Sequence, residues 1–172
     1  EKISNGGFES AIALPTATFF GWTIGTTGQA EMSIDDSGHN SMHSLQIVFN
    51  APNKLDRVNA SQTLVVQPNT QYRLEYFVRT EKLNSASPSV LVVLDSTDSN
   101  PLAFSEAAPT GTSDWKKISV DFKTKNSDGI TIFIGRLPCS VGDICPLFGT
   151  TWYDDFVLER SSSARSDGPQ TR

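Results

Sequence analysis

Apolar and polar residues alternate with a period of two in several separate segments of this chain. The alternating segments lie at 30–34, 45–49, 72–78, 118–122 and 130–134. Because successive side chains of a β-strand point to opposite faces, this alternation predicts half-buried strands with one face on a core. Two further runs, at 64–66 and 90–94, are apolar on both faces and are expected to be central strands. No segment has the pattern of a capped amphipathic helix.

Turn-forming residues separate these segments at short intervals. Gly, Pro, Asn, Asp and Ser gather at 36–38, 68–69, 96–101, 109–111 and 126–129. Eight or more short strands with such turns are typical of an all-β, two-sheet antiparallel β-sandwich. The 172 residues are enough for one domain, which we expect over residues 1–160. Residues 161–172 contain no large apolar side chain and predict a disordered tail or linker.

The charge balance narrows the class of partner. The chain has 19 acidic and 14 basic residues, a net charge of −5, which argues against nucleic acid and against an anionic membrane surface. No apolar run approaches the roughly 20 residues of a membrane-spanning helix, so membrane insertion is not expected. A neutral partner, such as a structural polysaccharide, fits this balance. The chain begins at Glu1 without an initiator methionine, so we expect a module excised from a larger exported chain.

The two cysteines, Cys139 and Cys145, lie close together in a loop with Gly and Pro. Both histidines, His39 and His43, lie far upstream, so a shared Cys/His zinc site is not expected. A local disulfide is favoured, which predicts an extracytoplasmic protein. The two histidines are predicted to be solvated loop residues rather than zinc ligands. The Asp-rich stretch 95–100 lacks the glycine and terminal glutamate of an EF-hand loop, so a solvated turn is expected there.

Charged groups flank an aromatic ring on the strand at 72–78. Arg73, Glu75, Phe77 and Arg79 share the face opposite the apolar one, and Glu31 has the same position on its own strand. This combination suits sugar recognition, because a ring can stack on the apolar face of a pyranose while charged groups bond its hydroxyls. The alternative is a solvated face with cross-strand pairs.

No catalytic residues are predicted, because nucleophile motifs and glycine-rich nucleotide motifs are absent from the sequence. A small glycosidase would need Glu31 and Glu75 as paired carboxyl groups about 5 to 9 Å apart.

Six short motifs follow one another along the chain. They are Asn-Gly-Gly-Phe-Glu at 5–9 with Gly-Trp at 21–22, Ser-Leu-Gln-Ile at 44–47, the stretch 62–74 ending in Tyr-Arg-Leu, Tyr-Phe-Val-Arg-Thr at 76–80, Trp-Lys-Lys-Ile-Ser-Val at 115–120, and Trp-Tyr-Asp-Asp-Phe-Val-Leu at 152–158. In this order they resemble carbohydrate-binding modules of the family 4/9/22 type. The resemblance covers residues 3–160.

This resemblance implies a jelly-roll β-sandwich, similar to galactose-binding-like domains. It implies a non-catalytic module that binds a glycan on the concave sheet face, attached to other domains in bacterial surface or secreted proteins. A structural Ca²⁺ would tie the N-terminal segment to the last strand through hard oxygen ligands. The matching positions are Glu9 and Asp154, with Asp155 as the alternative carboxylate. Backbone carbonyls near Gly7 and at 40–42 would be further ligands.

The sequence also departs from the family pattern. Ser41-Met42 replaces a usual glycine, and Glu75 stands where a small residue is usual. A structural or interaction β-sandwich without sugar binding is therefore the second hypothesis, and the small glycosidase is the third. Trp22 and Trp115 are expected to close the ends of the core rather than to stack on a ligand, whereas Trp152 fits either role.

Overall fold

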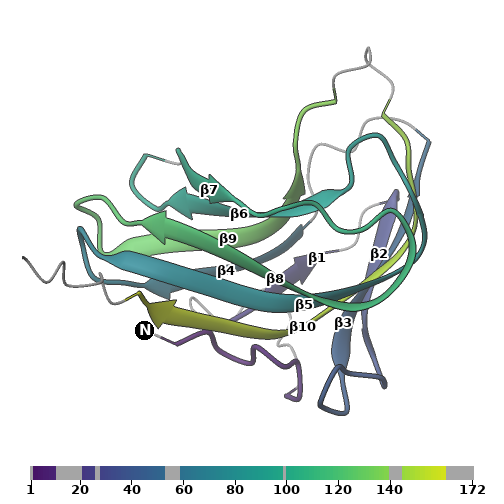
Figure 1. The fold of residues 1–172 in the computed structure, drawn as a ribbon, viewed down its shortest axis with the longest axis horizontal. Coiled ribbons are helices and arrows are strands. Elements are labelled where there is room, and N and C mark those ends of the chain that lie inside the picture. Colours follow the sequence, from purple (N-terminus) through teal and green to yellow (C-terminus); the bar gives the residue numbers. More distant parts are fainter. Residues whose placement is uncertain are drawn as a thin grey trace, which may run out of the picture.

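Two five-stranded antiparallel sheets pack face to face in this protein, as the computed structural model shows (Figure 1). The structure describes residues 2–10, 21–25, 28–52, 59–98, 100–139 and 145–161. From edge to edge, sheet A contains β1 (Thr23–Gly25), β4 (Asn59–Val65), β9 (Gly129–Arg136), β6 (Ser89–Asp95) and β7 (Pro101–Phe104). Sheet B contains β2 (Ala30–Asp35), β3 (Ser44–Ala51), β10 (Leu147–Arg160), β5 (Gln71–Asn84) and β8 (Gly111–Lys123).

The predicted all-β, two-sheet antiparallel β-sandwich is confirmed. Each alternating segment lies within a strand. The apolar run 64–66 begins in β4 and the run 90–94 lies in β6, and both strands have neighbours on both sides. No helix in the described residues is long and apolar enough to cross a membrane. The predicted tail begins beyond β10, and residues 162–172 lie outside the described part of the chain.

The core fills the space between the sheets because alternate side chains of each strand point inward. On β5, Tyr72, Leu74, Tyr76 and Val78 are at most 1% exposed, and the isoleucines of β9 are fully buried. The residues between them on β5 and β9 point outward, as the period of two predicts. The inner faces of both sheets are therefore apolar, and the outer faces are left to interact with other molecules.

An aromatic cluster joins the two ends of the chain. Trp22 is 2% exposed, and its ring lies 5.3 Å from that of Phe8 and 4.9 Å from that of Phe156, between ring centroids. Phe156 also stacks on Tyr76 at 5.0 Å. The prediction that Trp22 closes the core is confirmed. Phe8 belongs to the N-terminal segment, residues 2–10, whereas Tyr76 and Phe156 belong to β5 and β10. The packing of these rings therefore holds the N-terminal segment against the sandwich.

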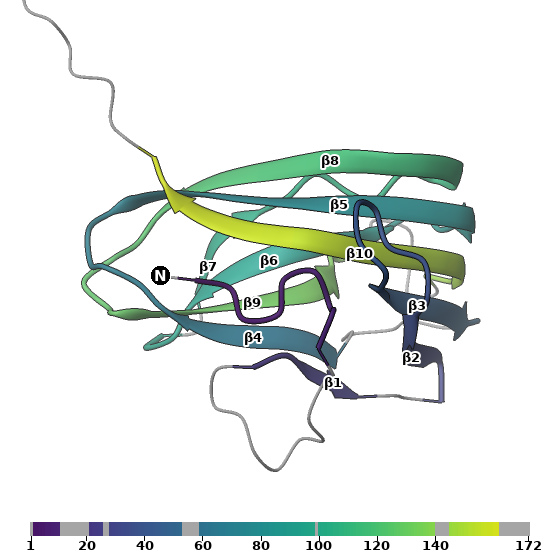
Figure 2. The same cartoon turned by 90° about the horizontal axis from the view of Figure 1, so that it is seen from below.

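The N-terminal segment runs between β4 and β10 along one side of the sandwich (Figure 2). On one side, the backbone of Ser4 exchanges two hydrogen bonds with the side-chain amide of Gln62, each 2.9 Å long. On the other, the backbone N–H of Phe156 donates to the carbonyl of Gly6 at 3.0 Å. β10 is irregular there, and Asp155 has a φ of 51°. This irregularity turns Phe156 into the core and places Asp154 and Asp155 beside the segment.

The predicted disulfide between Cys139 and Cys145 is confirmed, with Cα atoms 6.0 Å apart. It lies in the connection between β9 and β10, of which residues 140–144 are outside the described part of the chain.

Two buried threonines lie beside each other on neighbouring strands of sheet B. Thr80 of β5 pairs with Thr151 of β10, and neither side-chain oxygen has a hydrogen-bond partner. Thr80→Val should therefore raise the free energy of unfolding by about 1 kcal/mol, or the melting temperature by about 2–4 °C, because a desolvated hydroxyl is removed and both residues are β-branched. Thermal unfolding measures this effect. Thr63→Val is the control, since its hydroxyl lies 3.2 Å from that of Thr131; a lower melting temperature for Thr80→Val would contradict the prediction.

Candidate functional site

Three carboxylates from opposite ends of the chain surround Gly7. A Cβ atom placed on Gly7 would lie 3.7 Å from the Oδ1 atoms of both Asp154 and Asp155, and 3.8 Å from Cγ of Glu9. The structure therefore brings together the three residues that the resemblance assigned to a metal. Within the described residues, no three His, Cys, Asp or Glu side chains are already arranged to hold an ion. A metal here would thus also need backbone or solvent oxygens.

The loop between β2 and β3 lies across β10 and contacts this acidic cluster (Figure 2). The backbone N–H of His39 and the hydroxyl of Ser41 donate to Asp154 Oδ2 at 2.7 and 2.9 Å. The backbone N–H of His43 donates to Glu9 Oε1 at 2.8 Å and lowers the pKa of that carboxyl. Asp154 is fully buried, and this burial raises its pKa, with a further contribution from the charge of Asp155. A buried carboxylate beside a second acid favours a bound cation.

Both histidines lie at the acidic cluster rather than in solvent. His39 Nδ1 is 2.9 Å from Asp155 Oδ2, and His43 Nδ1 is 3.3 Å from Glu9 Oε2. The prediction of two solvated histidines is wrong, because each is half-buried in contact with an acid. Their contacts join residues that are distant in the sequence, so no local pattern indicated them.

The outer face of sheet B carries a stacked cluster of aromatic and basic side chains. The ring of His39 covers that of Phe77, with centroids 3.6 Å apart and planes 18° from parallel. The Arg79 guanidinium lies 5.2 Å from the centre of the Trp115 ring and 4.2 Å from that of Trp152. Trp115 is thus on the surface of the sheet, and the expectation that it closes the core is wrong. Its position is in phase with Lys117, which also faces outward.

The other sugar-binding candidates on β5 are paired with neighbours on β8. Arg73 donates two hydrogen bonds of 2.8 Å to Asp121, and Glu75 binds Lys117 at 2.6 Å and Ser119 at 3.1 Å. The hydrogen bond from Lys117 is the main cause of a lowered pKa of Glu75. These contacts are the cross-strand pairs that formed the alternative interpretation.

Glu31 lies apart from these residues, exposed on β2. β3 and β10 stand between β2 and β5, so Glu31 and Glu75 are separated by three strand spacings, roughly 14 Å before any offset along the strands. This exceeds the carboxyl separation of roughly 9.5 Å that hydrolysis of a glycoside tolerates. Glu31 and Glu75 therefore do not form the acid pair of a glycosidase.

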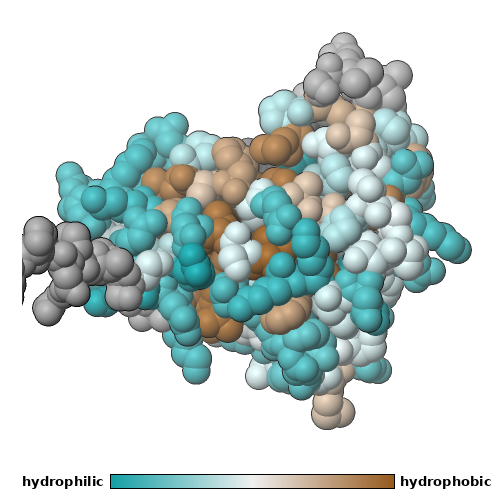
Figure 3. Space-filling model, in the orientation of Figure 1, coloured by the Kyte–Doolittle hydropathy of each residue, from teal (hydrophilic) through white to brown (hydrophobic). Residues whose placement is uncertain are grey.

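The outer face of sheet A has a different character. Phe133 of β9 lies over Gly135: a Cβ on that glycine would be only 2.6 Å from Cε2 of the ring and 3.3 Å from Cγ2 of Val92. Only glycine leaves room for the ring in this position. Val90 and Val92 also point away from the core, yet they are 2% and 3% exposed. Other parts of the chain therefore cover these two valines. Apolar residues gather over β6 and β7 (Figure 3).

Hydroxyl groups accompany Phe133, and charge is nearly absent. Ser61 pairs with Phe133 across β4 and β9, and the hydroxyls of Thr63 and Thr131 are 3.2 Å apart beside them. In the described strands of sheet A the charged residues are Asp95 and Arg136. Asp95 is buried and accepts hydrogen bonds from Thr97 and Ser127, while Arg136 is engaged in the connection that follows β9. An aromatic ring set among hydroxyls can bind an uncharged, hydroxyl-rich ligand.

Comparison with known proteins identifies the family. A family model described as a carbohydrate binding domain, of the CBM 4/9 type, matches residues 1–136. The chain belongs to this carbohydrate-binding domain family. The resemblance inferred from the six sequence motifs is thereby confirmed for this carbohydrate-binding domain. No curated protein matches the chain.

Solved structures share the fold of this carbohydrate-binding domain. A structure titled as CBM4 structure and function has a TM-score of 0.66 at 13% identity, covering 92% of this chain and 99% of that one. TmCBM61 in complex with β-1,4-galactotriose has a TM-score of 0.59 at 19% identity, covering 94% and 99%. The CBM22-1–GH10 modules of Clostridium thermocellum xylanase Xyn10B, complexed with xylohexaose, have a TM-score of 0.53 at 14% identity, covering 92% and 28%.

Proposed function

We propose that this domain binds a neutral polysaccharide without transforming it, and that the glycan lies on the outer face of sheet A. The observation that carries this proposal is the ring of Phe133, spread over Gly135 in the middle of the sheet. Such a ring can stack on the apolar face of a sugar, while Ser61, Thr63 and Thr131 bond its hydroxyls. Family membership supports the same function.

The outer face of sheet B is a poorer binding surface. There, Arg73 and Glu75 are already paired, and the predicted stacking ring of Phe77 is covered by His39. A sugar would have to break these contacts, and their replacement would gain little net free energy. Glu31, Arg73, Glu75, Phe77 and Arg79 stay a prediction, for a second surface to be tested beside the first.

Calorimetric titration with soluble β-glucan, xylan and mannan tests the proposal, together with an anionic polysaccharide such as polygalacturonate. We expect modest affinity for at least one neutral chain and none for the anionic one, because exchanging water contacts for protein contacts leaves a small surplus. Absence of binding to every neutral polysaccharide would overturn the proposal and favour a structural or interaction domain.

We also propose that Glu9, Asp154 and Asp155 hold a structural Ca²⁺, with backbone carbonyls near Gly7 and at 40–42 as further ligands. The proposal is supported by the position of these three acidic side chains around one glycine, because carboxylate oxygens are ligands that Ca²⁺ prefers. The ion would offset the repulsion between Asp154 and Asp155 and the desolvation of Asp154, and it would fasten the N-terminal segment to β10.

An extracytoplasmic location completes the proposal. The disulfide supports it, because such bonds rarely persist in the cytosol. Attachment to further domains is supported by the Xyn10B structure, in which a module with this fold is solved together with a GH10 module.

A further inference from the structure

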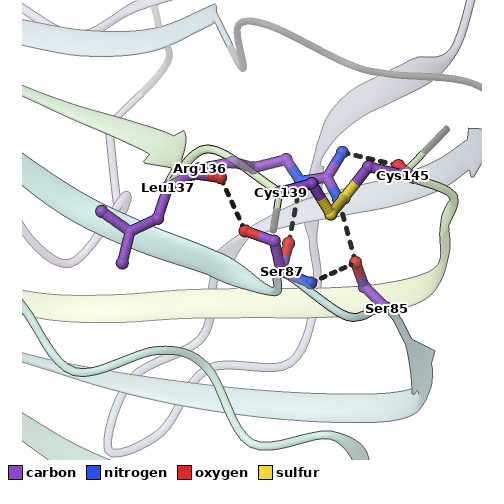
Figure 4. Close-up of a disulfide and its surroundings, with 6 residues drawn as sticks. All are labelled: Ser85, Ser87, Arg136, Leu137, Cys139 and Cys145. Carbon is purple, nitrogen blue, oxygen red and sulfur yellow. Dashed lines mark hydrogen bonds between the residues drawn. A yellow bond between two sulfur atoms is a disulfide. The ribbon is translucent and has the colours of Figure 1, made fainter. Parts of the chain in front are cut away.

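Arg136, the last residue of β9, lies directly against the Cys139–Cys145 disulfide (Figure 4). Its Nη2 atom donates to Cys145 Sγ at 2.9 Å, and its Nη1 atom donates to the Cys145 carbonyl at 3.1 Å. The end of β9 and the connection to β10 thus meet at the sulfur atom of Cys145. A guanidinium in this position carries a positive charge at neutral pH under all ordinary conditions.

The rest of the guanidinium is anchored to the turn between β5 and β6. Nε donates to the carbonyl of Ser87 at 2.8 Å, and Nη2 donates to the hydroxyl of Ser85 at 2.9 Å. Ser87 in turn donates from its hydroxyl to the carbonyl of Leu137 at 2.7 Å. Because the planar fork is held at both ends, its orientation toward Cys145 does not depend on the disulfide alone.

The two sulfur-bearing residues differ in their surroundings. Cys145 is 2% exposed, whereas Cys139 is partly open to solvent. A dissolved thiol therefore reaches Cys139 more readily. In thiol–disulfide exchange, the rate depends on which sulfur is attacked and on how stable the departing thiolate is. The exposure of Cys139 and the contact of Arg136 with Cys145 Sγ both favour attack at Cys139 and departure of Cys145.

We propose that this disulfide is a site of directed exchange with small-molecule thiols, in which Cys139 is attacked and Cys145 leaves as a thiolate held by Arg136. The incoming thiolate forms a new S–S bond with Cys139 Sγ, the bond between the two cysteines breaks, and its electron pair stays on Cys145 Sγ. A second thiol then attacks the mixed disulfide: both small thiols end as their own disulfide, and the two cysteines are reduced. Each cysteine thiolate takes its proton from solvent.

The direction of attack is measured on the unmodified protein. Glutathione is added together with iodoacetamide, the reaction is stopped with acid, and fragmentation mass spectrometry locates each adduct. We expect glutathione on Cys139 and the alkyl group on Cys145, in at least about fivefold excess over the reverse arrangement. Equal amounts of the two products, or an excess of the reverse one, would overturn the proposal.

The role of the charge is measured by the rate of reduction. Arg136→Gln should slow reduction by glutathione about tenfold, the loss of one charge-assisted hydrogen bond to the departing sulfur. Arg136→Lys should stay within about threefold of the wild-type rate because it keeps the charge. Arg73→Gln is the matched control, an arginine removed from a surface pair with Asp121, and should leave the rate unchanged. An Arg136→Gln protein that reacts as fast as wild type, or Arg136→Lys as slow as Arg136→Gln, would contradict the proposed role.

Discussion

Phe133→Ala is expected to weaken polysaccharide binding by about thirtyfold, measured by calorimetric titration with the neutral polysaccharide that binds best. Truncation of an aromatic side chain at the centre of an interface costs about 2 kcal/mol or more, which corresponds to this change in affinity. Phe133 lies on β9, the middle strand of sheet A, and it is the ring around which Ser61, Thr63 and Thr131 are placed.

Phe77→Ala is the matched control for Phe133→Ala. Both residues are half-buried phenylalanines on an outer sheet face, but Phe77 belongs to sheet B and lies beneath His39. The affinity of Phe77→Ala for the polysaccharide should stay within about twofold of wild type. The opposite result, with binding lost only in Phe77→Ala, would move the glycan to sheet B and make the β5 residues Arg73, Glu75 and Arg79 its ligands. Far-UV circular dichroism and thermal unfolding of both variants separate lost binding from lost folding.

Removal of calcium should lower the melting temperature by about 5–10 °C. A ligand at one hundred times its dissociation constant stabilises the folded state by about 2.7 kcal/mol, and in a chain of this size 1 kcal/mol corresponds to about 2–4 °C. The physical reason is the buried carboxylate of Asp154, which is desolvated and lies beside the charge of Asp155. Thermal unfolding in excess calcium and in excess chelator measures the difference.

Two variants locate this effect within the chain. Glu9→Gln and Asp154→Asn should abolish most of the calcium-dependent shift, because each removes a proposed ligand. Asp98→Asn is the control, since that carboxylate is exposed and paired with Lys125 in the turn between β6 and β7, away from Gly7. It should keep the full shift. Identical melting of the wild-type protein with calcium and with chelator would contradict the metal site.

The sequence predicted what depends on local periodicity. The strands of both sheets follow from alternating residues such as Tyr72, Leu74 and Tyr76, all of which are buried on one face of β5. The two cysteines of one loop predicted their own pairing. The meeting of Glu9 with Asp154 was reached through the family resemblance, since nothing in the spacing of two residues at opposite ends of a chain brings them together.

The remaining features depend on contacts between distant segments. His39 meets Asp155 because the loop between β2 and β3 crosses β10, and strand order is not contained in a pattern of alternation. The alternation at 130–134 places Phe133 on the face opposite the isoleucines of β9, but its importance depends on Gly135, which leaves the space for its ring. Trp115 had a usable signal, its phase with Lys117, which the general tendency of tryptophan to be buried outweighed.

The last strand of the chain lies in the middle of sheet B. β10 pairs with β3 on one side and with β5 on the other, and its Phe156 completes the aromatic cluster around Trp22. During synthesis on the ribosome, sheet B therefore stays divided until the final strand has left the exit tunnel. Folding of sheet B therefore waits for β10 and is dominated by long-range pairing. A chain that stops before β10 would expose two unpaired strand edges instead of a smaller native domain.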